Sequence, residues 1–375
     1  MDRAAPVLFL HAQGEISGGE ISLLILWEGL DRQRFRPCLA GPDATPLAAA
    51  ARRLDVAVLP AEFPPLRNIL SCRGWSHLRN LERQSRLLEP RILHGNTPRT
   101  NLAAAWLGWR LSRPVVWHER TLAMPEEWDV DRLLKRVPDR ILCNSHAVAR
   151  RFGGPDDRVR IIYNGVPLDR FAPGNGGETV RRSLGLSPTC VTVGIVGNFS
   201  RVKRHELFLQ AASRLSAELP SLRFLVVGGE LFPENRGREA ALRAEADRLG
   251  VAERVLFLGV RPDMPALFDA LDIVVSPCEA EACSRAILEA MASGTPVVTV
   301  AAGGSPELVI PGETGILCPP GDPAALAEAI GTLARDSDLR AAMGYAARRL
   351  AERRFSVDRQ VRETEEVYRS LLAES

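Results

Sequence analysis

Residues 271–298 read LDIVVSPCEAEACSRAILEAMASGTPVV, and this stretch decides the fold. Its first six residues, 271–276, form a short, mostly apolar run that is typical of a buried parallel strand. A loop with carboxylates follows, and then residues 285–293 of helix-forming composition, which stop at Gly294. A second apolar run starts at Val297. This order of strand, loop, helix and strand predicts a parallel α/β sheet. Its loop is expected at the carboxyl end of a strand, where such sheets bind ligands.

The same alternation of apolar runs and amphipathic stretches continues along the chain, which predicts α/β architecture with parallel sheets. Strands are expected at 7–10, 56–59, 92–94, 115–118, 140–143, 159–163, 191–196, 224–227, 255–258, 273–276, 297–300 and 315–318. Helices are expected at 21–30, 323–334, 336–354 and 357–373. A cluster of turn formers at 173–177 separates two series of strands and helices. We therefore expect two doubly wound domains that face each other across a cleft.

The composition excludes several classes of protein. The chain has 375 residues, 46% of them hydrophobic and 25% charged, and a net charge of +2, which gives no reason to expect a nucleic-acid partner. Its seven cysteines form no C-x-x-C pair, so neither a zinc site nor a disulfide framework is indicated. No stretch is long enough to span a membrane, and the first apolar run is too short for a signal peptide. We expect a cytoplasmic protein with reduced cysteines.

Two carboxylates in the opening stretch, Glu281 and Glu289, have seven residues between them and are followed by Ala-Met-Ala and Gly-Thr-Pro-Val-Val. In this context the E-x7-E spacing resembles the nucleotide-sugar site of retaining GT-B glycosyltransferases of family 4, also called group 1. The resemblance implies that Glu289 binds the ribose and Glu281 the donor sugar, with Ser284 and Arg285 beside them at the helix start. Backbone N–H groups there can face a phosphate. Glu279 competes for the role of Glu281, and a loop Glu with a solvated helix Glu is the alternative.

The resemblance also implies a domain organisation. It predicts an N-terminal acceptor-side Rossmann-like domain at 1–172 and a C-terminal nucleotide-sugar-binding Rossmann-like domain at 173–355. A last helix, 356–375, would return to the N-terminal domain.

Residues 194–205, GIVGNFSRVKRH, resemble the phosphate-binding loop of the family, in which an Arg and a Lys hold the donor diphosphate. Lys203 matches that Lys and is one of only two lysines in an Arg-rich chain. Asn198 stands where the family has its Arg, which is a departure, and Arg201 is a candidate to supply the missing charge. Positive charge is needed because the nucleoside diphosphate leaves with developing negative charge. A solvated basic loop is the alternative.

Candidates in the first domain lie at the ends of predicted strands. Gly18 and Gly19 let the backbone approach a ligand closely, and the resemblance implies that their loop meets the diphosphate and the transferred sugar. His118 matches a family histidine close to the donor hexose, although a core histidine is the alternative. The candidates for lining the acceptor pocket at the same edge are His94, Asn96 and Glu119.

Two further segments have competing explanations. Asp129-Val130-Asp131 looks like a metal-binding D-x-D, but it precedes a helical stretch, so helix capping explains it better. The resemblance to GT-B enzymes implies a site without a metal ion. No cofactor is expected, since the nucleotide sugar is a co-substrate. The basic segment 63–91 contains Trp75, and it can sit on anionic lipid or form a solvated helix face. Its arginines are Arg67, Arg73, Arg79, Arg83, Arg86 and Arg91.

The resemblance thus implies a metal-independent hexosyltransferase that uses a UDP- or GDP-sugar and a hydroxyl of a glycan or lipid-linked acceptor. Lys203, Glu281 and His118 are the predicted catalytic residues. The resemblance implies retention of configuration. No enzymic nucleophile is evident, so front-face attack is expected rather than a covalent intermediate. The setting implied by the resemblance is polysaccharide or glycolipid synthesis in the cytoplasm, with peripheral contact at the inner face of the plasma membrane. A GT-B-fold sugar-nucleotide epimerase and a non-catalytic nucleotide-sugar-binding protein remain as alternatives.

Overall fold

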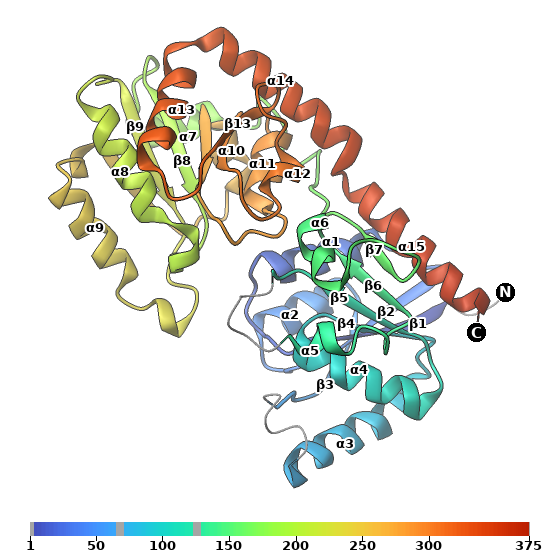
Figure 1. The fold of residues 1–375 in the computed structure, drawn as a ribbon. Coiled ribbons are helices and arrows are strands. Elements are labelled where there is room, and N and C mark those ends of the chain that lie inside the picture. The colour runs from blue at the N-terminus through green and yellow to red at the C-terminus, as the bar shows by residue number, and fades with distance from the viewer. Residues whose placement is uncertain (1–3, 65–70, 123–128, 375) are drawn as a thin grey trace. The chain divides into compact units, whose positions relative to one another are not determined.

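The computed structural model describes residues 4–64, 71–122 and 129–374 (Figure 1). The chain divides into two compact units, one of Met1–Gly165 with Val357–Ser375 and the other of Val166–Ser356. Residues 166–172, which the sequence analysis grouped with the first domain, lie in the second unit. They are held there by Arg348, whose guanidinium donates to the carbonyl oxygens of Leu168 and Phe171 at 3.2 and 2.6 Å.

In the described residues, the first unit has a seven-stranded parallel sheet with the order β3-β2-β1-β4-β5-β6-β7. The strands are β1 (Ala5–Leu10), β2 (Phe35–Gly41), β3 (Ala57–Pro60), β4 (Ile92–Gly95), β5 (Val115–Glu119), β6 (Arg140–Cys143) and β7 (Val159–Ile161). The helices are α1 (Gly18–Gly29), α2 (Pro46–Arg53), α3 (Cys72–Leu88), α4 (Pro98–Leu111), α5 (Val130–Leu133), α6 (His146–Ala149), η2 (Arg150–Phe152) and α15 (Val357–Glu374). The strand order reverses between β1 and β4, and ligands bind at the carboxyl ends of strands at such a switch point.

Two apolar clusters cover the two faces of this sheet. Successive side chains of a strand point to opposite faces, so Phe9 of β1 lies in one cluster with α1 and α15, while Leu8 lies in the other with α3 and α4. The helix α15 buries Tyr368 and Leu371 in the first cluster, where Tyr368 packs edge-on against Phe35 at a centroid distance of 5.5 Å. The last helix of the chain is therefore part of the core of the first unit.

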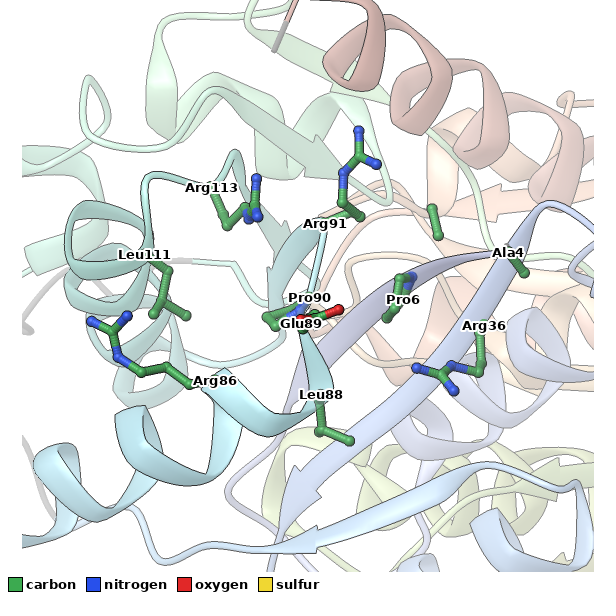
Figure 2. A pocket seen from close by; sticks show the side chains of 11 residues that line it. Ala4, Pro6, Arg36, Arg86, Leu88, Glu89, Pro90, Arg91, Leu111 and Arg113 are labelled. Atoms are coloured by element: carbon green, nitrogen blue, oxygen red, sulfur yellow. The ribbon is translucent and has the colours of Figure 1, made fainter. Parts of the chain in front are cut away.

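A cavity of about 910 Å³ lies at the amino ends of these strands (Figure 2). Its lining includes Pro6 of β1, Arg36 of β2, and Arg91 and Arg113, which lie just before β4 and β5. This edge of the sheet is opposite to the one where α/β sheets bind ligands. None of the predicted site residues lines it.

In the described part of the chain, the second unit has a six-stranded parallel sheet with the order β10-β9-β8-β11-β12-β13 and a switch point between β8 and β11. The strands are β8 (Val191–Val196), β9 (Leu222–Val227), β10 (Val255–Gly259), β11 (Ile273–Ser276), β12 (Val297–Val300) and β13 (Gly315–Cys318). The helices are α7 (Gly177–Ser183), η3 (Arg201–Lys203), α8 (His205–Ser216), η4 (Pro233–Asn235), α9 (Arg238–Arg248), η5 (Ala252–Arg254), α10 (Met264–Asp269), α11 (Arg285–Ala292), α12 (Ser305–Leu308), α13 (Pro323–Arg335) and α14 (Ser337–Arg354).

Local sequence sets the ends of the long helices in this unit. Asp322 caps α13 by accepting from the backbone N–H groups of Ala324 and Ala325 at 2.8 and 3.0 Å, and Pro323 occupies the first helical position, where its missing N–H costs nothing. Helix α11 starts after Ser284 and stops before Gly294, whose φ of +73° suits glycine.

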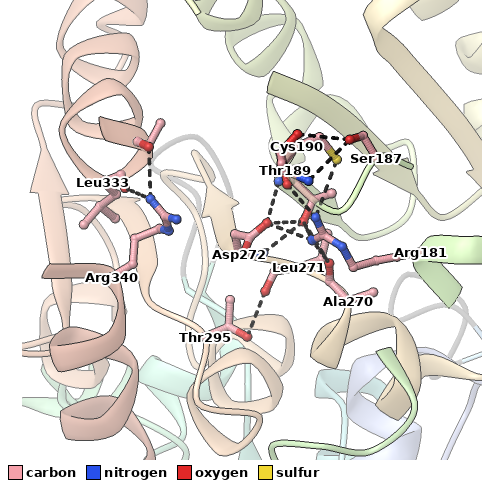
Figure 3. A network of polar contacts seen from close by, with 12 residues as sticks. Arg181, Ser187, Thr189, Cys190, Ala270, Leu271, Asp272, Thr295, Leu333 and Arg340 are labelled. Carbon is pink, nitrogen blue, oxygen red and sulfur yellow. Dashed lines mark hydrogen bonds and ion pairs between the residues drawn. The ribbon is translucent and has the colours of Figure 1, made fainter. Parts of the chain in front are cut away.

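A polar clasp closes the amino-terminal edge of the second sheet (Figure 3). The guanidinium of Arg181 in α7 donates to the carboxylate of Asp272 at 2.9 Å and to the carbonyl oxygen of Ala270 at 3.1 Å. The same carboxylate oxygen of Asp272 accepts from the backbone N–H and the hydroxyl of Thr192 at 2.7 and 2.8 Å. The clasp fixes α7 to the starts of β8 and β11, away from the carboxyl ends of the strands.

Candidate functional site

Two ion pairs join the loops that follow β8 and β11. The ammonium of Lys203 lies 2.6 Å from Oε2 of Glu281, and Arg204 lies 2.9 Å from Oε1 of Glu279. The two loops meet at the switch point of the second sheet, although the paired residues are far apart in sequence. The side chains of Lys203 and Glu281 are 25% and 16% exposed, so both stay within reach of a ligand. Burial opposes the charge on Lys203, but the carboxylate of Glu281 more than offsets it and raises the pKa of Lys203.

Helix α11 carries the second carboxylate of the predicted site. Glu289 receives a hydrogen bond from the guanidinium of Arg285, one turn earlier, at 2.9 Å. Burial raises the pKa of Glu289, although the nearby cations Arg285 and Arg170 oppose the shift. Ser284 is buried at the start of this helix, so Ser284, Arg285 and Glu289 lie together in one turn and a half.

The remaining two candidates of the phosphate-binding loop differ in how firmly they are held. Asn198 accepts the backbone N–H of Ser200 at 3.1 Å and thereby shapes the loop. Arg201 is exposed at the start of η3, and its side chain makes no hydrogen bond within the described ranges. That Arg201 supplies the positive charge which the family's arginine provides at the position of Asn198 stays a prediction.

In the first unit, His94 and His118 meet at the carboxyl ends of β4 and β5. Nε2 of His94 lies 3.3 Å from Nδ1 of His118, and Nδ1 of His94 lies 2.6 Å from the hydroxyl of Tyr368. Arg120 donates to Nδ1 of His118 and to Oδ1 of Asn96, each at 3.0 Å. Burial, and secondarily the charge of Arg120, lowers the pKa of both histidines well below the usual value, so both are neutral near pH 7.

The glycine loop lies beside this cluster. Gly18 and Gly19 begin α1, and a Cβ placed on Gly19 would lie 4.0 Å from Cδ of Arg120. The carboxylate of Glu20 accepts from the backbone N–H of Ser17 in this loop at 2.9 Å and contacts His11 at 2.8 Å. Burial opposes ionisation of Glu20, but these contacts lower its pKa to about 2. The structure thus brings the glycine pair, His94, Asn96 and His118 together.

Two family models match the chain, "Glycosyl transferases group 1" over residues 178–350 and "Glycosyltransferase Family 4" over residues 16–170. The chain belongs to the group 1 glycosyltransferases of GT-B fold.

Solved structures and curated sequences resemble this glycosyltransferase to different extents. HepE from Anabaena in complex with UDP has a TM-score of 0.86 and 25% identity, and the match covers 97% of this chain and 100% of HepE. The complex of HepE with UDP-glucose has a TM-score of 0.84 and 26% identity over 97% of this chain and 99% of that one. The D-inositol 3-phosphate glycosyltransferase of Corynebacterium urealyticum is 35% identical over 57% of this chain and 51% of its own length. The chain spans about half the length of the curated relatives it matches.

Glu119 is the predicted residue of this glycosyltransferase that the structure does not bring to the histidine pair. Because β5 continues through Glu119, this side chain points to the opposite face from His118. Its carboxylate contacts Asn101 and receives a hydrogen bond from Arg151 at 2.9 Å. Burial raises the pKa of Glu119, although Arg151 opposes the shift.

The D-x-D segment lies in the same network as Glu119. Asp129 accepts the backbone N–H of Arg132 at 3.0 Å, as a helix cap does, and pairs with Arg151 at 2.8 Å. Burial and the nearby carboxylate of Glu119 raise the pKa of Asp131 to about 7. In the part of the chain that the structure describes, no group of three or more metal-ligating side chains could hold an ion.

Sequence reasoning missed two members of the site. Arg120 is the cation that contacts His118 and Asn96, and burial lowers its pKa to about 10. Its only sequence signal is its position, two residues after the candidate histidine at a strand end. Tyr368 comes from the last helix and has no local signal at all, since it contacts a residue 274 positions away.

Proposed function

We propose that this glycosyltransferase is a retaining, metal-independent enzyme that moves a hexose from a nucleoside-diphosphate sugar to a hydroxyl of its acceptor. The observation that carries the proposal is the 2.6 Å contact between Lys203 and Glu281. A phosphate-binding cation and a carboxylate suited to sugar hydroxyls stand side by side at the switch point, where α/β folds bind nucleotides. The complexes of HepE with UDP and UDP-glucose make a UDP-sugar the first donor to test, with GDP-sugars as the second class.

The ion pair suggests how the donor enters. An arriving diphosphate offers Lys203 more negative charge than Glu281 does, so Lys203 turns to the phosphate. The freed carboxylate of Glu281 then accepts hydrogen bonds from hydroxyls of the hexose, while Glu289 accepts from the ribose. Each of these carboxylates is held in place by a neighbouring cation, Glu281 by Lys203 and Glu289 by Arg285.

In the reaction, the acceptor hydroxyl attacks the anomeric carbon on the face from which the diphosphate departs. The new glycosidic C–O bond forms, the C–O bond to the diphosphate breaks, and the hydroxyl proton passes to a phosphate oxygen of the leaving group. Lys203, together with Arg201, Asn198 and the backbone N–H groups around Ser284, stabilises the charge that develops on the diphosphate. Catalysis then consists of positioning and electrostatic stabilisation.

The acceptor and the cellular place are further parts of the proposal. Relatives named for D-inositol 3-phosphate make a polyol phosphate a candidate acceptor beside a glycan or a lipid-linked sugar. Among the described residues no helix is both long and apolar enough to cross a membrane. Helix α3 exposes Arg79, Arg83 and Trp75, which suits peripheral contact with anionic lipid at the inner face of the plasma membrane. Arg67 lies outside the described residues, as does the side chain of Arg73.

Sedimentation with lipid vesicles tests the membrane part. The doubly substituted variant Arg79→Glu/Arg83→Glu should lose binding to anionic vesicles, whereas Arg236→Glu, an exposed arginine of the second unit, should keep it. Equal sedimentation of all three proteins would reject the membrane contact and leave the transferase proposal standing.

The transferase itself is tested by the release of UDP or GDP from a panel of nucleotide sugars. Donor-selective release should be lost in Glu281→Ala and kept in Glu234→Ala, whose exposed carboxylate has no ion-pair partner in the described ranges. Conversion of a nucleotide sugar to its epimer without an acceptor would identify an epimerase. Binding without turnover across an acceptor panel would identify a binding protein. Absence of nucleotide binding would reject the site.

A further inference from the structure

A chain of buried hydrogen-bonding groups links the last helix of the protein to His118. It runs from the hydroxyl of Tyr368 in α15 to Nδ1 of His94 at 2.6 Å, and from Nε2 of His94 to Nδ1 of His118 at 3.3 Å. Tyr368 and His94 have no solvent exposure, and His118 is 1% exposed. Buried polar networks of this kind fix the orientation of hydrogen bonds, because each group has few alternative partners.

Arg120 determines which group donates in each hydrogen bond between His118, His94 and Tyr368. A guanidinium only donates, so Nδ1 of His118, which lies 3.0 Å from Nη2 of Arg120, must accept and carries no proton. A neutral imidazole has one N–H, and the proton of His118 is therefore on Nε2. Since Nδ1 of His118 has no proton, Nε2 of His94 must donate to it. Nδ1 of His94 is then an acceptor, and the hydroxyl of Tyr368 donates to it.

The free nitrogen of His118 is the one that can meet a ligand. The contacts that the structure describes for the ring nitrogens of His118 are both at Nδ1, so the N–H at Nε2 is the polar group of this side chain that remains for a ligand. The adjacent guanidinium at 3.0 Å and the N–H of His94 both draw electron density from the ring, which strengthens Nε2–H as a donor.

We infer that Arg120, His94 and Tyr368 are positioning residues that hold His118 in its Nε2–H tautomer, so that His118 meets a ligand as a hydrogen-bond donor and not as a base. The tautomer follows from the contacts of Arg120, His94 and Tyr368, whereas a sugar as the partner of His118 rests on the proposed function. The chemical class of group that His118 recognises is an acceptor oxygen, such as a hydroxyl or ring oxygen of a sugar.

Nitrogen-15 NMR of histidine-labelled protein tests the tautomer without any substrate. Nδ1 of His118 should resonate as an unprotonated nitrogen and Nε2 as an N–H, with resonances assigned by the His118→Gln spectrum. In Tyr368→Phe, the signal of Nδ1 of His94 should move toward that of a free acceptor nitrogen. Tyr345→Phe, which removes the hydroxyl of a tyrosine that is 70% exposed in α14, should leave it in place. A proton on Nδ1 of His118 in the unsubstituted protein would overturn the inference.

Activity variants test the role of the tautomer. A glutamine amide N–H lies close to the place of Nε2–H, whereas an asparagine amide N–H lies close to that of Nδ1. His118→Gln should therefore retain about tenfold more kcat/KM than His118→Asn, which is the effect of one hydrogen bond. Arg120→Lys, which still donates, should keep the Nε2–H signature and Arg120→Leu should weaken it. Equal activity of the Gln and Asn variants would reject donation to the sugar but leave both the NMR result and the transferase proposal intact.

Discussion

Gly303 offers a sharp test of how closely the position of Glu281 controls activity. It follows β12, at a φ of +58°, and a Cβ placed on it would lie 2.3 Å from the carbonyl oxygen of Glu281. The same carbonyl accepts the backbone N–H of Gly304 at 2.8 Å. The loop that presents Glu281 to Lys203 therefore rests directly on the backbone at Gly303, with no room for a side chain.

The effect of Gly303→Ala has two components. The first is the strain of a side chain in left-handed backbone, about 1–2 kcal/mol. The second is displacement, because Cβ atoms essentially never approach other atoms more closely than 3.0 Å, so the Glu281 carbonyl must move by about 0.7 Å. A shift of this size moves a carboxylate that has a 2.6 Å contact with Lys203. Misplacement of about 1 Å can lower a rate about a hundredfold.

Gly312→Ala separates the two components. Gly312 has a φ of +76°, and a Cβ there would meet nothing within 4 Å, so this variant has the strain without the displacement. Urea denaturation should show a loss of about 1–2 kcal/mol in Gly312→Ala and a larger loss in Gly303→Ala, which must also displace the Glu281 carbonyl. The value of kcat/KM for transfer from the best nucleotide sugar should fall about a hundredfold in Gly303→Ala and by less than about threefold in Gly312→Ala. Equal kcat/KM in both variants would refute the claim that the Glu281 loop positions a catalytic carboxylate.

Three further predictions follow from charges and contacts. Lys203→Met leaves the carboxylate of Glu281 without its partner, so stability should fall by about 1–3 kcal/mol and activity should be lost. The double variant Lys203→Met/Glu281→Gln should regain the stability, measured by urea denaturation, but not the activity; a regain of activity would contradict the assignment. Arg181→Leu removes the charged partner of Asp272 and should lower the free energy of unfolding by about 2–4 kcal/mol. The value of kcat/KM should stay unchanged, because the clasp lies at the amino ends of the strands. A large fall in kcat/KM would show that the clasp shapes the site. Burial lowers the pKa of His205 from 6.5 to about 4, so the unfolded chain takes up this proton at higher pH than the folded one, and stability is lost as the pH falls through this range. His205→Phe should lose less stability than the unsubstituted protein over the same pH range. Parallel plots of the free energy of unfolding against pH for the two proteins would contradict this.

The parallel strands of the second unit could be predicted closely, because buried parallel strands are continuous apolar runs. The expected bounds of 191–196, 273–276 and 297–300 agree with β8, β11 and β12. The sequence analysis missed β2 (Phe35–Gly41), which contains Arg36 and Pro37. Proline has no N–H and argues against a central strand, yet Pro37 pairs in register with Val7 of β1. Pairing with strands on both sides outweighed the local signal.

The predicted GT-B fold and family were confirmed. They could be predicted because the motifs that identify them are local runs of residues around single strand ends. The contacts within the site were harder to predict from the sequence. Lys203 and Glu281 lie 78 residues apart, so their 2.6 Å contact depends on β8 and β11 being neighbours. Glu119 was expected beside His118, but β5 extends one residue beyond the predicted strand and includes Glu119. Because successive side chains of a strand alternate between faces, Glu119 points to the face opposite His118. Tyr368 could not be anticipated, because only tertiary packing brings α15 to β4.

A crystal structure of the protein with UDP is the most direct test of the proposed donor site. A diphosphate oxygen should replace Oε2 of Glu281 beside the ammonium of Lys203, at the roughly 2.7–2.9 Å of a charged hydrogen bond, with the ribose hydroxyls at Glu289. A nucleotide bound elsewhere, for example among Arg36 and Arg91 in the cavity of Figure 2, with the Lys203–Glu281 pair intact, would contradict the account.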